Sequence, residues 1–304
     1  MLKHRVRRIE ALRKRCGDRG DGAKASAAAV PHPPIDLWAQ QHLPGYFSRP
    51  FSLFHHWLVG QLRDLHQRRG TRLALVAPRG SAKSTWVSLA YPLWAAIHRH
   101  EPYIQLISDS QSQARLLLEA LKREVEDNPA LADAYPAAAG RGRVWGQDRI
   151  RLANGVVVEA LGTGAKIRGR RNRAERPSLI VVDDPENDGH VTSALQRERS
   201  WSWFNRAVAN AGTPQTNVLV LGTALHRDCL VLRLTRTAGW RAQTFRASSV
   251  GRTGPICGHS GNRSLPPWKT PSMSSRHGRS MRAMRKRWGG AASCSGRSAR
   301  ACTS

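Results

Sequence analysis

Acidic residues are scarce in this 304-residue chain, which has 21 Asp and Glu against 49 Lys and Arg and a net charge of +28 at pH 7. No Asp or Glu follows Asp228. This absence excludes a metal site built from clustered carboxylates in the segment 248–304. The excess of positive charge favours a polyanionic partner, with nucleic acid ahead of an anionic membrane surface.

Long hydrophobic runs and patterned cysteines are also missing. The longest apolar stretch, near Val87–Ile97, is too short to cross a membrane and is interrupted by Ser88 and Pro92, so no membrane partner is expected. The basic N-terminus has no apolar segment behind it and does not resemble a secretory signal. The cysteines are odd in number and lack metal-ligand spacing, which indicates free thiols in a reducing cytoplasm. They are Cys16, Cys229, Cys257, Cys294 and Cys302.

Composition divides the chain into three parts. Residues 1–34 are basic and then rich in Ala and Pro, which predicts a flexible arm. Residues 35–247 alternate apolar runs with helical patterns, and we expect them to form one α/β domain. Residues 248–304 are rich in Arg, Ser and Gly, and we expect them to lack a core.

One segment has the layout of a phosphate-binding loop. Leu73–Val76 predicts a buried strand and Trp86–Ala90 predicts the start of a helix. In such a loop, backbone N–H groups and a lysine bind phosphate, and a hydroxyl ligates Mg²⁺. The usual pattern has glycine at two places that here hold Ala77 and Ala82, so an ordinary strand-turn-helix is an equal alternative at this point. The candidate nucleotide-binding residues are Pro78, Arg79, Gly80, Ser81, Ala82, Lys83, Ser84 and Thr85.

A second motif places acids directly after an aliphatic run. Leu179–Val182 predicts a buried parallel strand, and Asp183 and Asp184 follow it. In nucleotide-binding α/β sheets such a strand end lies near the phosphate loop, so Asp183 is expected to hold Mg²⁺. Asp184 or Glu186 would orient and deprotonate the attacking water. The alternative is a turn that is merely rich in acids.

Further segments complete the predicted domain. A third buried strand, Asn217–Leu221, ends at Gly222 and Thr223, and such a threonine is a candidate sensor of the γ-phosphate. The pair Asn154-Gly155 predicts a hairpin turn within 144–161. Other predicted elements are a helix within 35–67, a strand at 103–108, a helix at 111–126, a helix at 190–210 with Trp201, Trp203 and Phe204 in the core, and a strand at 240–245. We interpret His55, His56 and His66 as ordinary histidines without a ligand pattern.

Taken in order, these motifs resemble the large terminase subunit of tailed bacteriophages and prophages over residues 45–247. The matching stretches are Ala77–Thr85, Lys166–Gly169, Arg176–Asn187 and Gly222–Asp228. Members of that family replace the phosphate-loop glycines in the same way. The resemblance implies a P-loop NTPase of the RecA-like ASCE type, with a mainly parallel central sheet flanked by helices.

The resemblance also implies an activity, which is ATP hydrolysis that drives double-stranded DNA into an empty capsid in the bacterial cytoplasm. Lys83 and Ser84 match the groups that bind phosphate and Mg²⁺, and Arg79 matches a loop arginine near the γ-phosphate. Asp183 matches the metal-binding acid, and Asp184 matches the catalytic acid, although Glu186 is close enough in sequence to compete. The implied partners are a small terminase subunit, the capsid portal and further copies of the chain in a ring.

The segment 248–304 departs from the family, which continues with an RNase H-like nuclease domain. Its composition resembles GC-rich coding DNA read in a wrong frame, and a one-base shift permits a reading with acids and aromatics. We therefore expect a frame slip near residues 247–248 and no nuclease domain in this chain. Resequencing the gene through codon 247 tests this expectation.

Three alternatives stay open from sequence. The arginines of 168–173 would contact DNA or a neighbouring subunit's nucleotide, or would simply be solvated. A second alternative is that the chain is another RecA-like DNA-dependent ATPase such as a helicase, although a second motor domain is not visible. A third alternative is a basic DNA-binding protein without enzymatic activity.

Overall fold

The computed structural model describes residues 32–246 of the chain. Most of the predicted N-terminal arm and the predicted segment 248–304 therefore lie outside the described residues. Within them, no helix is long and apolar enough to cross a membrane.

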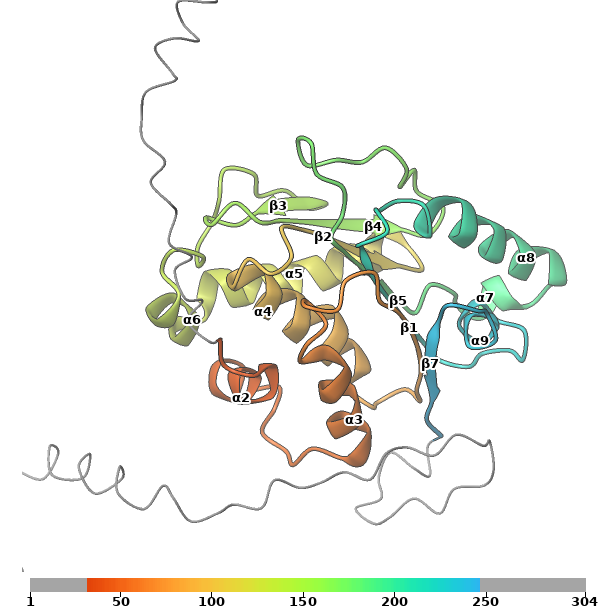
Figure 1. Ribbon diagram of the computed structural model, residues 1–304, viewed down its shortest axis with the longest axis horizontal. Coiled ribbons are helices and arrows are strands. Elements are labelled where there is room, and N and C mark those ends of the chain that lie inside the picture. Colours follow the sequence, from red (N-terminus) through yellow and green to blue (C-terminus); the bar gives the residue numbers. More distant parts are fainter. Residues whose placement is uncertain (1–31, 247–304) are drawn as a thin grey trace, which may run out of the picture. The chain divides into compact units, whose positions relative to one another are not determined.

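A seven-stranded sheet forms the centre of the domain, in the order β3-β4-β2-β5-β6-β1-β7 (Figure 1). Neighbouring strands run parallel, except that β3 is antiparallel to β4. The mainly parallel architecture predicted from the sequence is thus confirmed. The strands are β1 Arg72–Val76, β2 Tyr103–Ser108, β3 Arg149–Arg151, β4 Val157–Gly162, β5 Leu179–Asp183, β6 Asn217–Gly222 and β7 Arg241–Thr244.

Helices cover both faces of this sheet, with α3, α4 and α5 on one face and α8 and α9 on the other (Figure 1). Two short segments, Thr85–Ala90 and Phe204–Val208, are π-helical. The α-helices are α2 Ile35–His42, α3 Leu53–Leu62, α4 Tyr91–Ile97, α5 Gln111–Asp127, α6 Pro129–Ala134, α7 Asp188–Val191, α8 Ala194–Trp203 and α9 Leu230–Leu234.

The alternation of side chains along each strand divides the core into two layers. In β1, Leu73 and Leu75 pack on the side of α2 to α5, and Ala74 and Val76 pack on the side of α9. Every residue of β2, β4, β5 and β6 is buried, as expected of strands covered on both faces. This burial fixes the carboxyl ends of the central strands as a rigid platform.

The sequence predicted most elements near their true bounds and missed two features. The predicted helix within 35–67 is divided into α2 and α3, because Pro44 and Gly45 fall between them in a turn. Of the aromatic residues predicted in the core near α8, only Phe204 is buried. Trp201 and Trp203 are half-buried, since they pack at the rim of the layer rather than inside it. The hairpin forms as predicted, with Gly155 at φ 92°.

Candidate functional site

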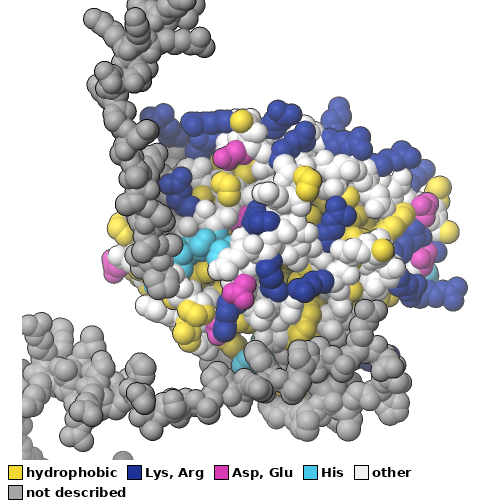
Figure 2. Space-filling view, viewed as in Figure 1, with side chains coloured by type: hydrophobic (Ala, Val, Ile, Leu, Met, Phe, Trp, Pro, Cys, Tyr) yellow, Lys and Arg dark blue, Asp and Glu magenta, His cyan; other side chains and the backbone are white. Residues whose placement is uncertain are grey.

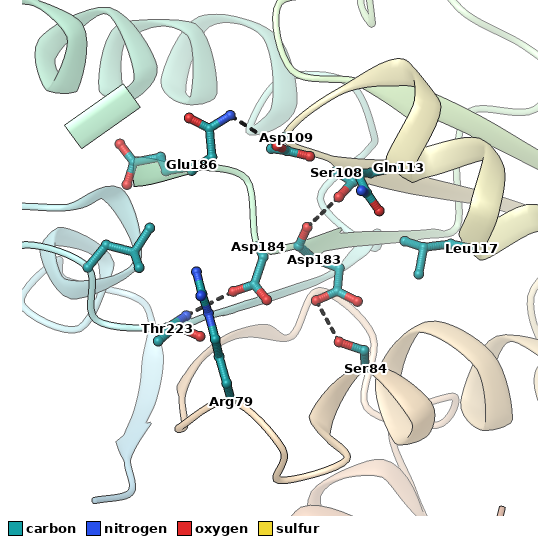
Figure 3. Close-up of a pocket in the computed structure, with 12 residues that line it drawn as sticks. Arg79, Ser84, Ser108, Asp109, Gln113, Leu117, Asp183, Asp184, Glu186 and Thr223 are labelled. Carbon is teal, nitrogen blue, oxygen red and sulfur yellow. Dashed lines mark hydrogen bonds between the residues drawn. The ribbon is translucent and has the colours of Figure 1, made fainter. Parts of the chain in front are cut away.

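The carboxyl ends of β1, β5 and β6 meet around a cavity of about 290 Å³ (Figure 3). The strand β6 lies between β1 and β5, so the two sequence motifs follow strands that are not neighbours in the sheet. Their side chains nevertheless converge on this cavity. Its lining residues are Arg79, Ser84, Ser108, Asp109, Gln113, Leu117, Asp183, Asp184, Glu186, Asn187, Thr223 and Leu225.

The two alanines that replace glycine in the loop after β1 have different backbone conformations. Ala77 continues the strand, with its N–H donating to the Gly222 carbonyl at 3.2 Å and only 1% of its surface exposed. Ala82 has φ 56°, in the left-handed region that favours glycine. A side chain in this region costs about 1–2 kcal/mol. The loop therefore needs contacts that stabilise Ala82 in this conformation.

Lys83 is buried beneath the loop and reaches the ends of two other strands. Its Nζ lies 3.1 Å from Asp184 Oδ2 and donates to Thr223 Oγ1 at 3.4 Å. Only 6% of Lys83 is exposed, so its charge faces the ends of β5 and β6 rather than solvent. This geometry brings together three of the residues predicted from the sequence.

Asp183 ends β5 as a buried carboxylate whose hydrogen bonds come from serine hydroxyls. Ser84 Oγ donates to Oδ1 at 3.0 Å and Ser88 Oγ donates to Oδ2 at 2.6 Å. Burial and the neighbouring charge of Asp184 raise the pKa of Asp183 to about 6, although the hydrogen bonds from the two serines and the charge of Lys83 oppose this shift. Burial therefore disfavours the ionised form of Asp183, and a cation bound next to it would stabilise that form.

The chemistry of this donor set fits Mg²⁺. The ion prefers oxygen ligands, and Ser84 and Asp183 present a hydroxyl and a carboxylate oxygen to each other at the cavity. A bound divalent cation would favour the ionised form of Asp183, which burial disfavours. Among the described residues, no cluster of three His, Cys, Asp or Glu side chains is arranged to hold a metal.

Asp184 follows Asp183 but faces the loop after β1 from a strained backbone. Its φ is 43°, and its N–H donates to the Leu221 carbonyl at 2.9 Å. The Asp184 side chain accepts a hydrogen bond from the Thr223 N–H at 2.9 Å and is 42% exposed. Its carboxylate is thus accessible from the cavity and held next to the Lys83 charge.

Glu186 lines the same cavity with its carboxylate directed elsewhere (Figure 3). Oε2 accepts a hydrogen bond from the Leu230 N–H, the first amide of α9, at 2.6 Å. Only 8% of Glu186 is exposed, and burial raises the pKa of its carboxyl. The structure thus separates the two candidate acids, since Asp184 faces Lys83 and Glu186 is bound to a helix end.

The remaining loop residues differ in exposure. Arg79 lines the cavity with a 73% exposed side chain and lies 4.0 Å from Asp188. Gly80 adopts φ 76°, and Ser81 Oγ donates to the Pro78 carbonyl at 2.8 Å, which closes the turn. Thr85 is half-buried at the start of the π-helical segment. Arg79 therefore has the freedom to approach a ligand, whereas the turn behind it is fixed.

The arginine-rich loop between β4 and β5 is anchored by some of its own arginines. Arg170 Nη1 lies 2.5 Å from Glu159, whose side chain is 4% exposed. Arg168 donates to the Arg206 carbonyl. Arg171 and Arg173 are exposed. The cluster predicted as one unit therefore contains an anchored part and an exposed part.

Sequence reasoning missed two residues that contact this site. Ser88 lies four positions after Ser84, which places both hydroxyls on one side of the helical segment, and this spacing was the available signal. His55, interpreted from sequence as an ordinary histidine, contacts the carbonyl of Ser81. No local pattern announces that contact, because it joins residues 26 positions apart.

Comparisons with known proteins found no matching family profile and no matching curated protein. The similar solved structures include the following two. One is an arginine mutant of the large terminase ATPase domain of Thermus phage P74-26, with 11% identity and a TM-score of 0.42 over 60% of this chain and 78% of that one. The other is a large terminase of a thermophilic bacteriophage, with 14% identity and a TM-score of 0.40 over 66% of this chain and 47% of that one.

Proposed function

We propose that the chain is the ATPase part of a motor like the large terminase subunit, which uses ATP and Mg²⁺ to move double-stranded DNA. One observation supports this most strongly. Ser84 of the phosphate loop and Asp183 at the end of β5, 99 residues apart in sequence, contact each other at 3.0 Å beside Lys83. A hydroxyl, a carboxylate and a lysine in this arrangement suit a nucleotide phosphate with its metal ion.

Each residue has a distinct role in this proposal. Lys83 and the backbone N–H groups of the loop bind the phosphates, and Ser84 and Asp183 hold Mg²⁺, which neutralises charge that develops on the phosphate oxygens. Arg79, exposed at the rim, supplies a further positive charge near the γ-phosphate.

Asp184 is the proposed base that orients water and accepts its proton. Its carboxylate is paired with Lys83 in the described structure, at 3.1 Å. Phosphate oxygens would compete for the same ammonium group and leave Asp184 available to water. Thr223 contacts both Lys83 and Asp184, so it is the proposed sensor of the phosphate state.

The proposed DNA contact uses the basic rim near β3 and the loop before β5. Figure 2 shows Lys and Arg side chains along the upper edge of the molecule, where Figure 1 places β3. Exposed positive residues in this region are Arg141, Arg143, Lys166, Arg168, Arg171 and Arg173. A sequence-independent motor grips phosphates, for which such a surface is suited. A small terminase subunit, the capsid portal and a ring of copies are the further proposed partners.

The direct test is ATP hydrolysis by the purified full chain, with and without double-stranded DNA. We expect DNA-stimulated hydrolysis that is lost in Lys83→Ala and Asp183→Ala. Hydrolysis that survives both changes would overturn the assignment of the site. DNA binding without hydrolysis would indicate a non-enzymatic DNA-binding protein. Stimulation by empty procapsids would distinguish a packaging motor from a helicase.

The DNA surface has its own test in the double variant Arg171→Ala/Arg173→Ala. Each lost phosphate contact lowers the slope of log K against log salt by about 1, so the slope should fall by about 2. Arg123→Ala, an exposed arginine on α5, is the matched control. Equal slopes in the double variant and wild type would place the DNA elsewhere.

A further inference from the structure

His55 joins α3 to the phosphate loop through both nitrogens of its ring. Nε2 lies 3.0 Å from the Ser81 carbonyl oxygen, and Nδ1 lies 3.1 Å from the Ser52 backbone nitrogen at the start of α3. The ring also contacts Phe54 edge-on, with 5.2 Å between centroids. The imidazole is therefore fixed from three sides.

The two contacts determine where the ring proton is. The Ser52 N–H can only donate, so Nδ1 must accept, and the Ser81 carbonyl can only accept, so Nε2 must donate. This arrangement requires the neutral ring with its hydrogen on Nε2. Burial lowers the pKa of His55 and outweighs the hydrogen bond to the Ser81 carbonyl, which raises it, so the same neutral form is favoured.

The contact fixes the peptide group before Ala82. In a planar trans peptide the carbonyl and the following N–H point in opposite directions. Because the Ser81 carbonyl points at His55, the Ala82 N–H points to the other side of the loop. Ala82 itself has φ 56°, a conformation that an alanine does not favour. A contact from outside the loop, such as the one from His55 to the Ser81 carbonyl, can hold the peptide in this orientation.

We propose that His55 is a positioning residue for nucleotide binding, which holds the Ser81–Ala82 peptide so that its N–H is presented to phosphate. His55 thereby supplies the restraint that lets alanine occupy a place where phosphate loops usually have glycine. This inference rests on the proposed function, because it assigns a role in binding the same nucleotide.

Two conservative substitutions separate the two contacts of the ring. His55→Gln retains an N–H donor at the position of Nε2, which reaches Ser81. His55→Asn retains an acceptor near the position of Nδ1, which reaches Ser52, and loses the loop contact. His56→Ala, an exposed neighbour on the same helix, is the control.

The measurement is the dissociation constant of ADP with Mg²⁺, with thermal unfolding as a check on folding. We expect His55→Asn to weaken ADP binding about tenfold, the size expected for one hydrogen bond. His55→Gln should stay within about threefold of wild type. Equal binding by His55→Asn and wild type, or equal losses in Asn and Gln variants, would overturn the inference.

A second pair of variants uses the alanine itself and stays informative if His55→Asn unfolds. Glycine adopts φ 56° without a side-chain clash, so Ala82→Gly should reduce the dependence on His55. We expect His55→Gln and His55→Ala to differ in ADP affinity in the wild-type background and to converge in the Ala82→Gly background. An undiminished difference would contradict the proposal. Wild-type protein that does not bind ADP with Mg²⁺ would instead contradict the proposed function.

Discussion

The sheet has an amino edge, where the central parallel strands begin, and a carboxyl edge, where they end. A buried carboxylate lies at each edge, and the two have different environments. Glu101, before β2 at the amino edge, is fully buried and accepts two hydrogen bonds from Arg69, at 2.6 and 3.2 Å. Asn217, the first residue of β6, also donates to it at 3.3 Å. Asp183, at the carboxyl edge, is 4% exposed and is hydrogen-bonded by serine hydroxyls.

The difference shows how one fold uses buried charge for two purposes. Burial raises the pKa of Glu101, and Arg69 opposes that shift, so the ion pair forms within the chain itself. The pKa of Asp183 rises to about 6. The buried charge of Glu101 is therefore neutralised within the chain, whereas the buried charge of Asp183 would be stabilised by a bound cation.

Removing the cation at the amino edge should have the largest effect on stability. Arg69→Ala leaves the Glu101 charge buried without its partner, which typically costs about 3–5 kcal/mol of unfolding free energy. ATPase activity per folded molecule should stay close to that of wild type. Chemical denaturation measures the first quantity, with the exposed Arg72→Ala as control. Equal stability of the two variants would refute the contrast between the edges.

Within the carboxyl edge, Asp184 and Glu186 should respond differently to loss of charge. Asp184→Asn removes the proposed base next to Lys83, and we expect ATP turnover to fall about 10²–10⁴-fold. Glu186→Gln retains an oxygen that accepts from the Leu230 N–H, so turnover per folded molecule should change less than about threefold. Steady-state ATPase assays decide between them. The reverse ranking would make Glu186 the catalytic acid.

Neutralising Asp183 should stabilise the metal-free protein, in contrast to Arg69→Ala. The pKa of Asp183 is raised from 3.8 to about 6, so the folded state binds a proton more readily than the unfolded state. The stability that this raised pKa contributes to the folded state is fully present below pH 3.8 and is lost as pH rises through about 6. The free energy of unfolding of Asp183→Asn should therefore be about 1–3 kcal/mol higher than that of wild type at pH 8.

The pH dependence provides the check on that expectation. The difference in stability between Asp183→Asn and wild type, measured in EDTA, should shrink as pH falls from 8 to 4. Ser88→Ala is a useful companion, because it removes the 2.6 Å hydrogen bond to Asp183 and should lower stability. A constant difference across this pH range would mean that Asp183 titrates normally.

The sequence predicted the strands well because their physical signals are local. The strands β1, β5 and β6 are mainly aliphatic runs, and the turns carry residues such as Gly155 that favour a left-handed backbone. The loop and the acid pair after β5 were likewise visible, because they follow the strands directly. Side chains at the ends of parallel strands share one edge, so their proximity was predictable in outline.

What the sequence left open depends on contacts between distant segments. Asp184 and Glu186 differ only through their partners, Lys83 and the Leu230 N–H, and the second lies 44 positions from Glu186. The role of His55 depends on a carbonyl 26 positions away. Such choices are made by tertiary packing, and no periodicity or spacing records them.

The most direct test of the contrast is the melting temperature of wild type and Asp183→Asn at pH 8, with ADP in the presence and absence of Mg²⁺. A ligand that binds the folded state raises its stability. We predict that Asp183→Asn melts higher than wild type without ligand and that Mg²⁺ adds to the ADP-induced shift only in wild type. A variant that melts lower than wild type and still responds to Mg²⁺ would contradict the account.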